Sequence, residues 1–403
     1  MYNLTDRNII LGVSGSIAAY KAADLASKLT QAGARLDVVL TPVAERFVTP
    51  LTFQSVTGRR AYVDMFDTAS GASEQHVEMA RRAHALLVAP ATATTIARIA
   101  LGLAEDMLSL TALATRAPIV ICPAMDPHMY EHEATQGHLE TLLSRGVHVV
   151  GPEVGRLASG HTGPGRMSDV DTIIGGLRYV LGRDGDLAAK KVVVSAGGTQ
   201  EPIDPVRYVG NYSSGKMGYA LAEAARDRGA DVALVSGAVA LPVPYAVRAV
   251  FVRSAAEMRD AVVVECADAD ALIMAAAVAD YQPAEAIGQK MKRRRESFSL
   301  PLVRTPDILA EVGHRQGLVR VGFAAESEDL LANARHKLEE KGLEFIVAND
   351  VTADGCGFGS DTNKVTLIDR QGEEELTLMP KYDVAARVLD RVVTLVQAQG
   401  ARK

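Results

Sequence analysis

Residues 8–16, NIILGVSGS, and residues 190–199, KKVVVSAGGT, decide the fold of this chain. Each is an apolar, β-rich run that ends in glycine and a hydroxyl residue. Each also opens a series of apolar runs that alternate with helical stretches: LDVVL, ALLVAP, PIVICPA and HVVGP first, then DVALVSG, ALIMAAA, RVGFAAE and FIVAND. Apolar runs of this kind, separated by helices, are typical of parallel strands covered on both faces of a sheet.

The predicted fold class is therefore α/β, with two doubly wound, flavodoxin/Rossmann-like domains whose sheets are mainly parallel and whose crossovers are right-handed. Between the two series lies GRDGDLAAK, residues 182–190, where glycine and charge density rise and the periodicity stops. Such a stretch is typical of a short linker. We place the boundary there, which predicts domains at residues 1–183 and 184–403.

The composition excludes several classes of protein. The chain has 403 residues, 48% of them hydrophobic, and a net charge of −6, which argues against a disordered chain and against a nucleic-acid binder. Its 3 cysteines are too few and too scattered for a disulfide framework or a zinc site. The longest apolar run, Ala271 to Ala279, is half the length that crosses a bilayer. We expect a cytoplasmic protein with no membrane and no nucleic-acid partner.

Small and hydroxyl residues follow several strands of the first series. Gly15 and Ser16 follow the first strand, Thr41 follows the second, and the run 89–95, APATATT, follows the next. Because the carboxyl ends of parallel strands meet in one crevice, these groups and a helix start suit a phosphate-bearing planar cofactor. An equally open interpretation of Gly15-Ser16 is a plain strand-to-helix turn with a serine cap.

Three further features of this half invite a chemical interpretation. His76 precedes the strand ALLVAP and titrates near neutrality, although a lone histidine is more often structural. His128 and His132 have helical metal spacing but no third ligand, so a metal site is not favoured. The stretch 155–167, GRLASGHTGPGRM, is predicted to be a mobile glycine-rich loop over an anion, or else a surface loop.

The motifs GSIAAYK, HVEM, PAM-x-x-x-M and ASG-x-x-G-x-GRM occur in one order. This half thereby resembles the flavin-dependent cysteine decarboxylases, in particular the phosphopantothenoylcysteine decarboxylase domain. The resemblance implies FMN in trimers whose sites lie between subunits. It also implies oxidation of the cysteinyl carbon next to sulfur, loss of carbon dioxide and return of the hydride. The cofactor-binding residues that we predict are Gly15, Ser16, Thr41, Ala93 and Thr94.

Carried over residue by residue, His76 matches the catalytic histidine of the family. Asp126 stands where the family has asparagine, Ser159 where several members have a cysteine that protonates the intermediate, and Tyr130 where the motif has tryptophan. Ionised aspartate can only accept hydrogen bonds and repels a substrate carboxylate. We therefore expect Asp126 to be protonated in the complex or paired with a nearby arginine. Since serine is a far weaker acid than cysteine, the final proton would come from another group.

The densest signal of the second half is SAGGTQEPIDPVRYVGNYSSGKMG, residues 195–218. Its glycines end a strand, its prolines stiffen a loop, and SSGK precedes a helical pattern, so that free N–H groups and Lys216 favour an anion site. The match to a phosphate-binding loop is partial, and simple capping is the alternative. Farther on, Asp280 ends an apolar strand, and QKMKRRRE, residues 289–296, is either a lysine-bearing flap over polyphosphate or a solvated loop.

These motifs, together with TPDIL at 305–309, GFAAE at 322–326 and ANDV, resemble the bacterial CTP-using phosphopantothenate–cysteine ligases. The two halves together resemble the bifunctional enzymes of coenzyme A synthesis. The resemblance implies that CTP activates phosphopantothenate as an acyl-cytidylate, which the amine of cysteine then attacks. It implies a nucleotide site with these members: Asp280, Lys290, Pro306, Asp307, Ile308, Leu309, Phe323, Lys337 and Lys341.

The same resemblance assigns three roles and the assembly. Asn211 orients the acyl-cytidylate, Arg207 clamps the substrate phosphate, and Lys290 offsets charge in the transition state. Mg²⁺ accompanies the triphosphate, although its ligands are not readable. Decarboxylase trimers and ligase dimers imply a homo-oligomer, a dodecamer by family resemblance. Open alternatives are a ligase with a non-catalytic flavin-binding regulatory module, a generic nucleotide-binding oxidoreductase and an interaction protein that uses the basic run.

Overall fold

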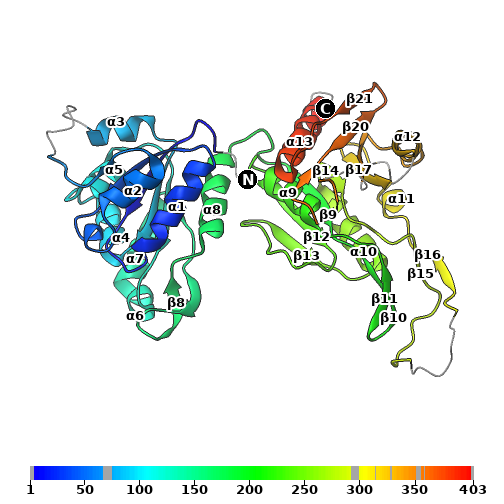
Figure 1. Ribbon diagram of the computed structural model, residues 1–403, viewed down its shortest axis with the longest axis horizontal. Helices are drawn as coiled ribbons and strands as arrows, with labels where there is room; N and C mark the ends of the chain where they lie inside the picture. The colour runs from blue at the N-terminus through cyan, green and yellow to red at the C-terminus, as the bar shows by residue number, and fades with distance from the viewer. Residues whose placement is uncertain are drawn as a thin grey trace. The chain divides into compact units, whose positions relative to one another are not determined.

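The computed structural model describes residues 4–66, 75–291, 299–313, 315–326, 329–350, 355–357 and 359–400. The chain divides into two compact units, Met1–Leu181 and Gly182–Lys403 (Figure 1). The sequence boundary was placed after residue 183, two residues farther on. Each unit is built around its own sheet and is described by itself.

The sheet of the amino-terminal unit has six strands in the order β3-β2-β1-β4-β5-β6, and all of its neighbours are parallel. This is the doubly wound order. Its switch point lies between β1 and β4, because the strands after β1 are added toward one edge of the sheet and those after β4 toward the other. The predicted parallel α/β architecture is confirmed. The strand bounds are β1 (Asn8–Val13), β2 (Arg35–Leu40), β3 (Ala61–Tyr62), β4 (Ala85–Ala91), β5 (Ile119–Pro123) and β6 (His148–Val149).

Helices cover both faces of this sheet because both faces of its strands are apolar. On one face α3, α4, α5 and α7 pack on Ile10, Leu86, Val88 and Ile121, while α1 contacts β1, β2 and β4 on the other. The helix bounds are α1 (Ala19–Gln31), α2 (Pro50–Thr57), α3 (Gln75–Arg82), α4 (Ala93–Leu101), α5 (Met107–Ala114), α6 (Pro127–Glu131), α7 (Glu133–Ser144) and α8 (Val170–Gly182).

The stretch predicted to be a glycine-rich loop is a β-hairpin instead. Strands β7 (Glu153–Arg156) and β8 (Thr162–Arg166) pair antiparallel, and the tight turn between them is closed by the Leu157 N–H to the His161 carbonyl. The loop prediction was wrong because glycine lowers strand propensity without forbidding pairing. Here the glycines serve close packing: a Cβ on Gly163 would lie 2.9 Å from Pro127 Cγ.

The carboxy-terminal unit repeats the architecture and extends it. Its sheet has eight strands in the order β13-β12-β9-β14-β17-β18-β20-β21. The first six are parallel, with the switch point between β9 and β14, and the last two are antiparallel. The strand bounds are β9 (Lys191–Ala196), β12 (Asp231–Ser236), β13 (Arg248–Phe251), β14 (Ala271–Met274), β17 (Val319–Glu326), β18 (Phe345–Asp350), β20 (Val365–Asp369) and β21 (Glu373–Glu375).

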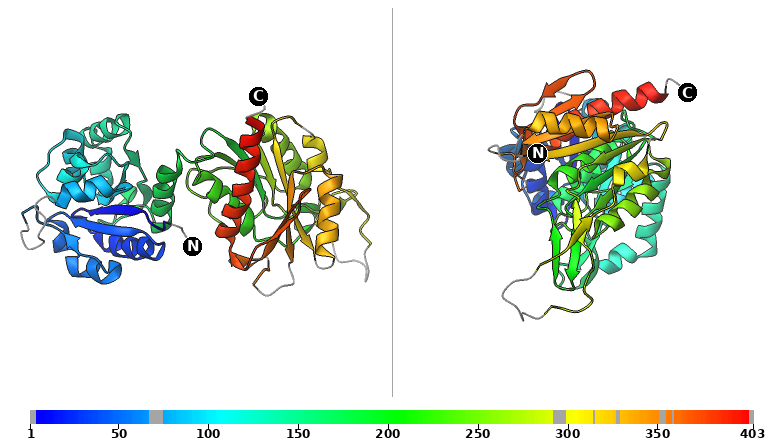
Figure 2. Two further views of the ribbon diagram at one scale, coloured as in Figure 1. Left: turned by 90° about the horizontal axis from the view of Figure 1, so that it is seen from above. Right: turned by 90° about the vertical axis from the view of Figure 1, so that its right-hand side faces the viewer.

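Two helices cover one face of this sheet, and three cover the other. The larger core lies under α9 (Lys216–Arg226) and the long α13 (Lys381–Gly400), which Figure 2 shows in red against the sheet. The opposite face carries α10 (Ala255–Glu265), α11 (Ile308–Val312) and α12 (Leu330–Glu340). Within the described ranges, none of the helices combines the length and the apolar character that crossing a bilayer requires.

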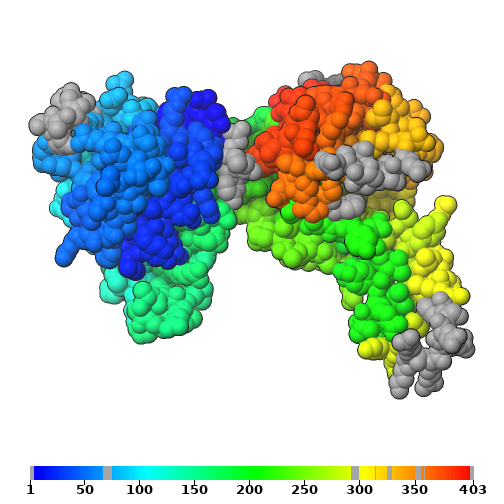
Figure 3. Space-filling model, viewed as in Figure 1, coloured from blue at the N-terminus to red at the C-terminus, as the bar shows by residue number. Residues whose placement is uncertain are grey.

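Short strand pairs extend from this unit. Strands β10 (Gln200–Asp204) and β11 (Arg207–Gly210) form one hairpin, β15 (Tyr281–Pro283) pairs with β16 (Leu302–Arg304), and β19 (Thr362–Asn363) pairs with β22 (Met379–Pro380). The first two pairs project from the unit together (Figure 3) and are joined by the Ile287 N–H to the Ile203 carbonyl, 2.9 Å. Residues 292–298, most of the basic run, lie outside the described residues.

Candidate functional sites

A cleft of about 560 Å³ opens at the switch point of the amino-terminal sheet. This volume is in the range of roughly 300–1,000 Å³ that is usual for small-molecule sites. The turn after β1 and the start of α1 form one wall. The N-cap residue Ala18 makes no side-chain capping bond, and the Ser16 hydroxyl accepts from the Ala18 N–H at 3.2 Å. The polar lining includes Gly15, Ser16, Lys21, Thr92, Asp126, Arg156, Ser159 and Arg166.

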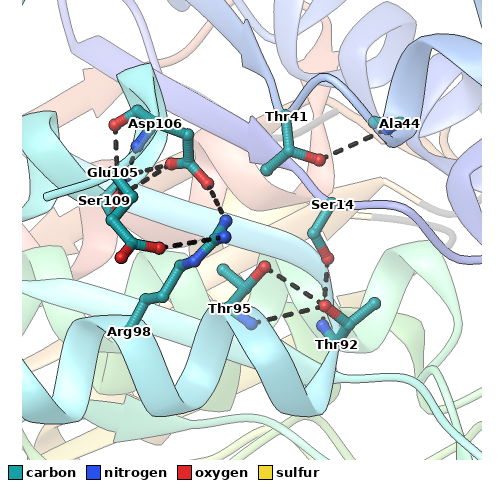
Figure 4. A network of polar contacts seen from close by, with 9 residues as sticks. All are labelled: Ser14, Thr41, Ala44, Thr92, Thr95, Arg98, Glu105, Asp106 and Ser109. Carbon is teal, nitrogen blue, oxygen red and sulfur yellow. Dashed lines mark hydrogen bonds and ion pairs between the residues drawn. The ribbon is translucent and has the colours of Figure 1, made fainter. Parts of the chain in front are cut away.

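Hydroxyl groups tie the strand ends around this cleft together (Figure 4). The Ser14 hydroxyl donates to the Pro90 carbonyl at 2.7 Å and accepts from the Thr92 N–H at 2.9 Å, which links β1 to β4 across the switch point. Thr92 in turn caps α4 by accepting from the Thr95 N–H. The cleft wall is therefore rigid before any ligand enters.

The same network continues along α4 into α5. Arg98 forms an ion pair with Asp106 at 2.7 Å and with Glu105 at 3.2 Å. Asp106 also accepts from the Ser109 N–H at 2.7 Å and so caps α5. Because Asp106 is 5% exposed, its pairing with both groups satisfies an otherwise costly buried charge.

The structure gathers some of the residues predicted for the cofactor and leaves others outside. Gly15 and Ser16 line the cleft, whereas Thr41, Ala93 and Thr94 do not. The Thr41 hydroxyl accepts from the Ala44 N–H at 3.3 Å in the turn after β2. Thr92 belongs to the run 89–95 that the sequence singles out, but it was not among the residues named for the cofactor. A threonine that directly follows a strand and precedes a helix is a usual helix cap.

The catalytic residues proposed for this half also divide into two groups. Asp126 and Ser159 line the cleft, while His76 lies half-buried on α3, away from the lining residues. Figure 1 shows α6, which begins after Asp126, beside β8. Two close contacts keep them together: the Met125 N–H donates to the Gly165 carbonyl at 3.0 Å, and a Cβ on Gly165 would lie 2.2 Å from the Met125 oxygen.

Asp126 is paired with a histidine rather than with the expected arginine. Its Oδ2 atom lies 3.3 Å from His161 Nδ1 and accepts from the Ser159 hydroxyl at 3.0 Å, and its Oδ1 accepts from the His128 N–H at 3.2 Å. The hydrogen bond from His161 lowers the pKa of the Asp126 carboxyl, and those from Ser159 and His128 lower it further. The carboxyl is therefore ionised at neutral pH in the free chain.

Two cations line the same cleft: Lys21 in the first turn of α1 and Arg166 at the end of β8. Burial lowers the pKa of the Lys21 ammonium, and the Arg166 guanidinium lowers it further. Lys21 Nζ donates to the Met167 carbonyl at 3.5 Å. A partly buried lysine and an exposed arginine beside a helix start make this part of the cleft electropositive, which suits an anionic ligand.

The carboxy-terminal unit has two adjoining clefts at its own switch point. One of about 610 Å³ lies between β14, β17, α11 and α12, and one of about 490 Å³ lies against the start of α9. They share Ala276, Val278, Asp280, Phe323 and Lys337 in their walls. A ligand that fills one cleft therefore reaches the wall of the other.

The first cleft gathers the residues predicted for the nucleotide. Eight of the nine line it, namely Asp280, Pro306, Asp307, Ile308, Leu309, Phe323, Lys337 and Lys341. Asp307 caps α11 through the Ala310 N–H at 3.1 Å and pairs with Lys341 Nζ at 2.6 Å. The hydrogen bond to Asp307 raises the pKa of Lys341, which is therefore a cation at the cleft at any physiological pH.

The second cleft is shaped by the segment 195–218. The turn residues Gly197 and Gly215 have φ of 78° and 76°, and a Cβ on Gly198 would lie 2.7 Å from the Asn211 carbonyl oxygen. Glycine is required where the backbone takes this conformation and this close approach. Asn211 lines the cleft, and its Nδ2 donates to the Val278 carbonyl at 3.0 Å.

Lys216 follows the cap of α9 and lines the second cleft. Its Nζ donates to Asp361 Oδ1 and to the Gly359 carbonyl, both at 2.7 Å. The hydrogen bond from Lys216 lowers the pKa of the Asp361 carboxyl. Burial lowers the pKa of the neighbouring Lys381, and the charge of Lys216 lowers it further. Sequence reasoning noted Lys216 but had no signal for Lys381, which is 165 residues closer to the carboxyl end.

Arg207 and Lys290 lie on the projecting arm and are not among the lining residues of either cleft. Arg207 pairs with Asp204 at 3.1 Å and donates to the Met291 carbonyl at 2.7 Å. Asp204 also accepts from the Met291 N–H at 3.2 Å, so the residue after Lys290 is held at both backbone groups. The roles assigned to Arg207 and Lys290 stay predictions.

The described part of the chain holds no cluster of three or more histidine, cysteine, aspartate or glutamate side chains that could bind a metal ion. Asp280 is the carboxylate that both clefts share. Mg²⁺ usually binds through one or two carboxylates together with substrate phosphates rather than in a protein cage. This donor set fits a Mg²⁺ ion that a triphosphate carries.

Comparisons with known proteins agree with the two-unit architecture. The Flavoprotein family model matches residues 1–181, and the model described as DNA/pantothenate metabolism flavoprotein C-terminal domain matches residues 187–396. A solved carboxy-terminal domain of a coenzyme A biosynthesis bifunctional protein CoaBC is 38% identical, covers 53% of this chain and 99% of its own, and has a TM-score of 0.46.

Two curated relatives span the chain from end to end. Coenzyme A biosynthesis bifunctional protein CoaBC from Vibrio vulnificus (strain YJ016) is 45% identical, over 98% of this chain and 100% of its own length. The protein of the same name from Bacillus subtilis (strain 168) is 44% identical, over 99% of this chain and 100% of its own length. The chain therefore belongs to the family of bifunctional coenzyme A biosynthesis proteins, in which a flavoprotein decarboxylase domain precedes a ligase domain.

Proposed function

We propose that this chain joins cysteine to phosphopantothenate with CTP and then decarboxylates the product, phosphopantothenoylcysteine, to phosphopantetheine with FMN. One observation carries the proposal. Eight residues expected to hold a nucleotide line a single cleft, and that cleft shares Asp280, Phe323 and Lys337 with the cleft that contains Asn211. Activation of a carboxylate and attack on it by an amine need two such adjoining sites.

In the ligation, the residues of the first cleft bind and orient CTP. Lys341 and Lys337 lie on the wall where the triphosphate charge is to be neutralised, and the apolar Ile308, Leu309 and Phe323 are suited to the base and ribose. Asn211 lies across the shared wall, where its amide would orient the activated acyl group for cysteine. Lys290 on the arm would offset charge that develops in the transition state.

FMN fits the amino-terminal cleft. Its phosphate would sit at the open start of α1 beside Gly15 and Ser16, and Met125, Met129 and Leu157 offer apolar contacts for the ring system. When bound, the flavin supplies the electron sink that side chains lack for loss of the carboxylate next to an amide-bearing carbon. Lys21 and Arg166 would bind the anionic substrate.

His76 supports a trimeric arrangement of this half. It does not line the cleft of its own chain, and the resemblance places flavin sites between subunits. We therefore propose that His76 acts in the cleft of a neighbouring copy. Sedimentation of the purified holoenzyme measures its oligomeric state, and assays on a mixture of the His76→Asn and Asp126→Ala variants test whether two copies complete one site. Mixed oligomers should regain activity, and no recovery after subunit exchange would refute it.

The decisive test scores the two reactions separately on one preparation. The chain, reconstituted with FMN, is supplied with CTP, Mg²⁺, cysteine and phosphopantothenate, and pyrophosphate and carbon dioxide are measured. We expect both products in equal amounts. Release of pyrophosphate without carbon dioxide, even from added phosphopantothenoylcysteine, would favour the alternative of a flavin-binding module without catalysis, which Asp126 and Ser159 keep open. Absence of both would refute the proposal.

A further inference from the structure

The tip of the β7–β8 hairpin brings two side chains to one oxygen of Asp126. The Ser159 hydroxyl and His161 Nδ1 lie 3.0 and 3.3 Å from Asp126 Oδ2. Asp126 and Ser159 line the amino-terminal cleft, whereas the His161 side chain is 62% exposed to solvent. Solvent thus reaches the Asp126 carboxylate through His161 as well as directly, because the Asp126 side chain is itself 27% exposed.

The hairpin holds this arrangement by backbone contacts that do not depend on the three side chains. Gly163 packs against Pro127, and Gly165 accepts from the Met125 N–H at 3.0 Å, so β8 lies directly on the segment that carries Asp126. Across the turn, the Gly160 N–H donates to the Leu157 carbonyl at 2.9 Å. Side chains placed by such a frame lose little conformational freedom when they interact.

The chemistry of the proposed decarboxylation requires a proton at this cleft. Overall, the bond from the cysteinyl α-carbon to its carboxylate breaks, carbon dioxide leaves, and a C–H bond forms at that carbon. The balance needs one proton from the protein or solvent and no net electrons. Ser159 stands where related enzymes carry an acidic thiol, and its hydroxyl is too weak an acid to take over that role unaided.

Resting on the proposed function, we infer that Asp126 and His161 form the proton-delivery pair for this step. Asp126, ionised in the free chain, takes up a proton from His161 when the substrate carboxylate lies beside it, and it is the catalytic residue that hands this proton to the substrate carbon. His161 is the positioning residue that reloads Asp126 through Nδ1 and is itself recharged from solvent. Ser159 fixes the orientation of the carboxyl.

Other charged groups lie near Asp126, and one of them provides a control variant for the test. His128, on α6, has Nδ1 3.5 Å from Asp126 Oδ1 and is 86% exposed, and Lys21, Arg156 and Arg166 line the same cleft. His128 approaches the oxygen that Ser159 does not contact. A His128→Gln variant is therefore the matched control for His161→Gln, since both remove an exposed imidazole near the same carboxylate.

The test measures carbon dioxide release from phosphopantothenoylcysteine by the FMN-loaded full chain between pH 5 and 9. General acid catalysis typically contributes a factor of about 10²–10⁴. We expect kcat of His161→Gln to fall about 100-fold with KM nearly unchanged. Its pH profile should lose the limb along which the rate falls as an imidazolium deprotonates. His128→Gln should keep both kcat and that limb. An unchanged His161→Gln profile, or loss of the limb in His128→Gln instead, would overturn the inference.

A second readout does not use activity. In spectra of the holoenzyme labelled with ¹⁵N-histidine, the His161 Nδ1–H should give a low-field proton signal that Asp126→Asn weakens and Ser159→Ala retains. Absence of that signal in the unmodified holoenzyme would overturn the pair whatever the variants do. Flavin absorbance of each variant reports that the site is intact. If the unmodified enzyme releases no carbon dioxide, the proposed function fails, whereas an active enzyme indifferent to His161 refutes the pair alone.

Discussion

Replacement of Gly165 by alanine tests the close packing that places β8 on the segment of Asp126. Gly165 has φ of 140°, and an added Cβ would lie 2.2 Å from the Met125 carbonyl oxygen, so the backbone must shift. The shift also lengthens the hydrogen bond from the Met125 N–H, now 3.0 Å. Strain of about 1–3 kcal/mol and a lost hydrogen bond of about 0.5–1.5 kcal/mol give a destabilisation of about 2–4 kcal/mol.

For a domain of this size, each kcal/mol lowers Tm by about 2–4 °C, so the Gly165→Ala flavin domain should unfold about 5–15 °C earlier. Differential scanning calorimetry of the full chain measures this. Decarboxylation should also fall by about tenfold or more, because Ser159 and His161 move away from Asp126.

Two other glycines separate the causes. Gly160 has φ of 87° but nothing within 4 Å of an added Cβ, so Gly160→Ala has only the backbone penalty of about 1 kcal/mol. Gly137 lies inside α7 with open space around it, and Gly137→Ala should stabilise the domain by about 0.5–1 kcal/mol. If Gly165→Ala unfolds within about 2 °C of Gly160→Ala, the packing argument is refuted.

Three further predictions concern the carboxy-terminal unit. Lys341→Met should raise KM for CTP about tenfold, a loss of about 1.4 kcal/mol in binding, and should leave decarboxylation of added phosphopantothenoylcysteine unchanged. The control is Lys364→Met, which removes an ion pair with Glu375 outside the cleft. Equal effects of the two substitutions would count against the nucleotide cleft. Asn211→Ala should keep pyrophosphate release while amide formation falls about 100-fold, and a parallel loss of both in stopped assays would contradict its assignment to the second half-reaction. The hydrogen bond from Arg248 lowers the pKa of Glu265 from 4.5 to about 2, so the ionised carboxylate stabilises the fold above pH 4.5 and this contribution disappears as the pH falls toward 2. The difference in Tm between the unmodified chain and Glu265→Gln should therefore shrink as the pH is lowered from 4.5 to 2. A constant difference would refute the linkage.

The parallel core of each unit could be predicted because its evidence is local. Apolar runs such as residues 9–13 and 192–196 predict strands that are buried on both faces, and the glycine and serine residues at their ends predict the turn into the crevice. The strand pairs outside the core escaped prediction. In β7 and β8 glycines are retained for packing against Pro127 and Met125, a contact between segments about 40 residues apart that leaves no periodic signal.

The candidate sites show the same division. Residues 306–309 and Lys341 line one cleft, as predicted. They could be predicted because a helix cap such as Asp307 and the spacing of lysines on a helix are visible in the local sequence. The partner of Asp126 could not be predicted: arginine was expected, and the structure supplies His161 from the hairpin tip. Thr41 follows β2 and Thr94 lies in the first turn of α4, and neither lines the cleft of this chain. The Thr41 hydroxyl bonds to its own turn, and the assignment of both residues to the cofactor stays a prediction.

The shared wall of the two carboxy-terminal clefts explains why activation and amide formation occur in one unit. An acyl-cytidylate is exposed to hydrolysis wherever water reaches it, so the product of the first half-reaction must not travel. Asp280, Phe323 and Lys337 line both clefts, so in the proposed reaction the acyl carbon would lie at the wall that the nucleotide residues and Asn211 share. Cysteine must then enter from the Asn211 side. A substitution that blocks that side, such as Ser213→Phe, should leave CTP-dependent release of pyrophosphate intact for one turnover and stop the second. Continued multiple turnover at an undiminished rate would show that cysteine enters by another route.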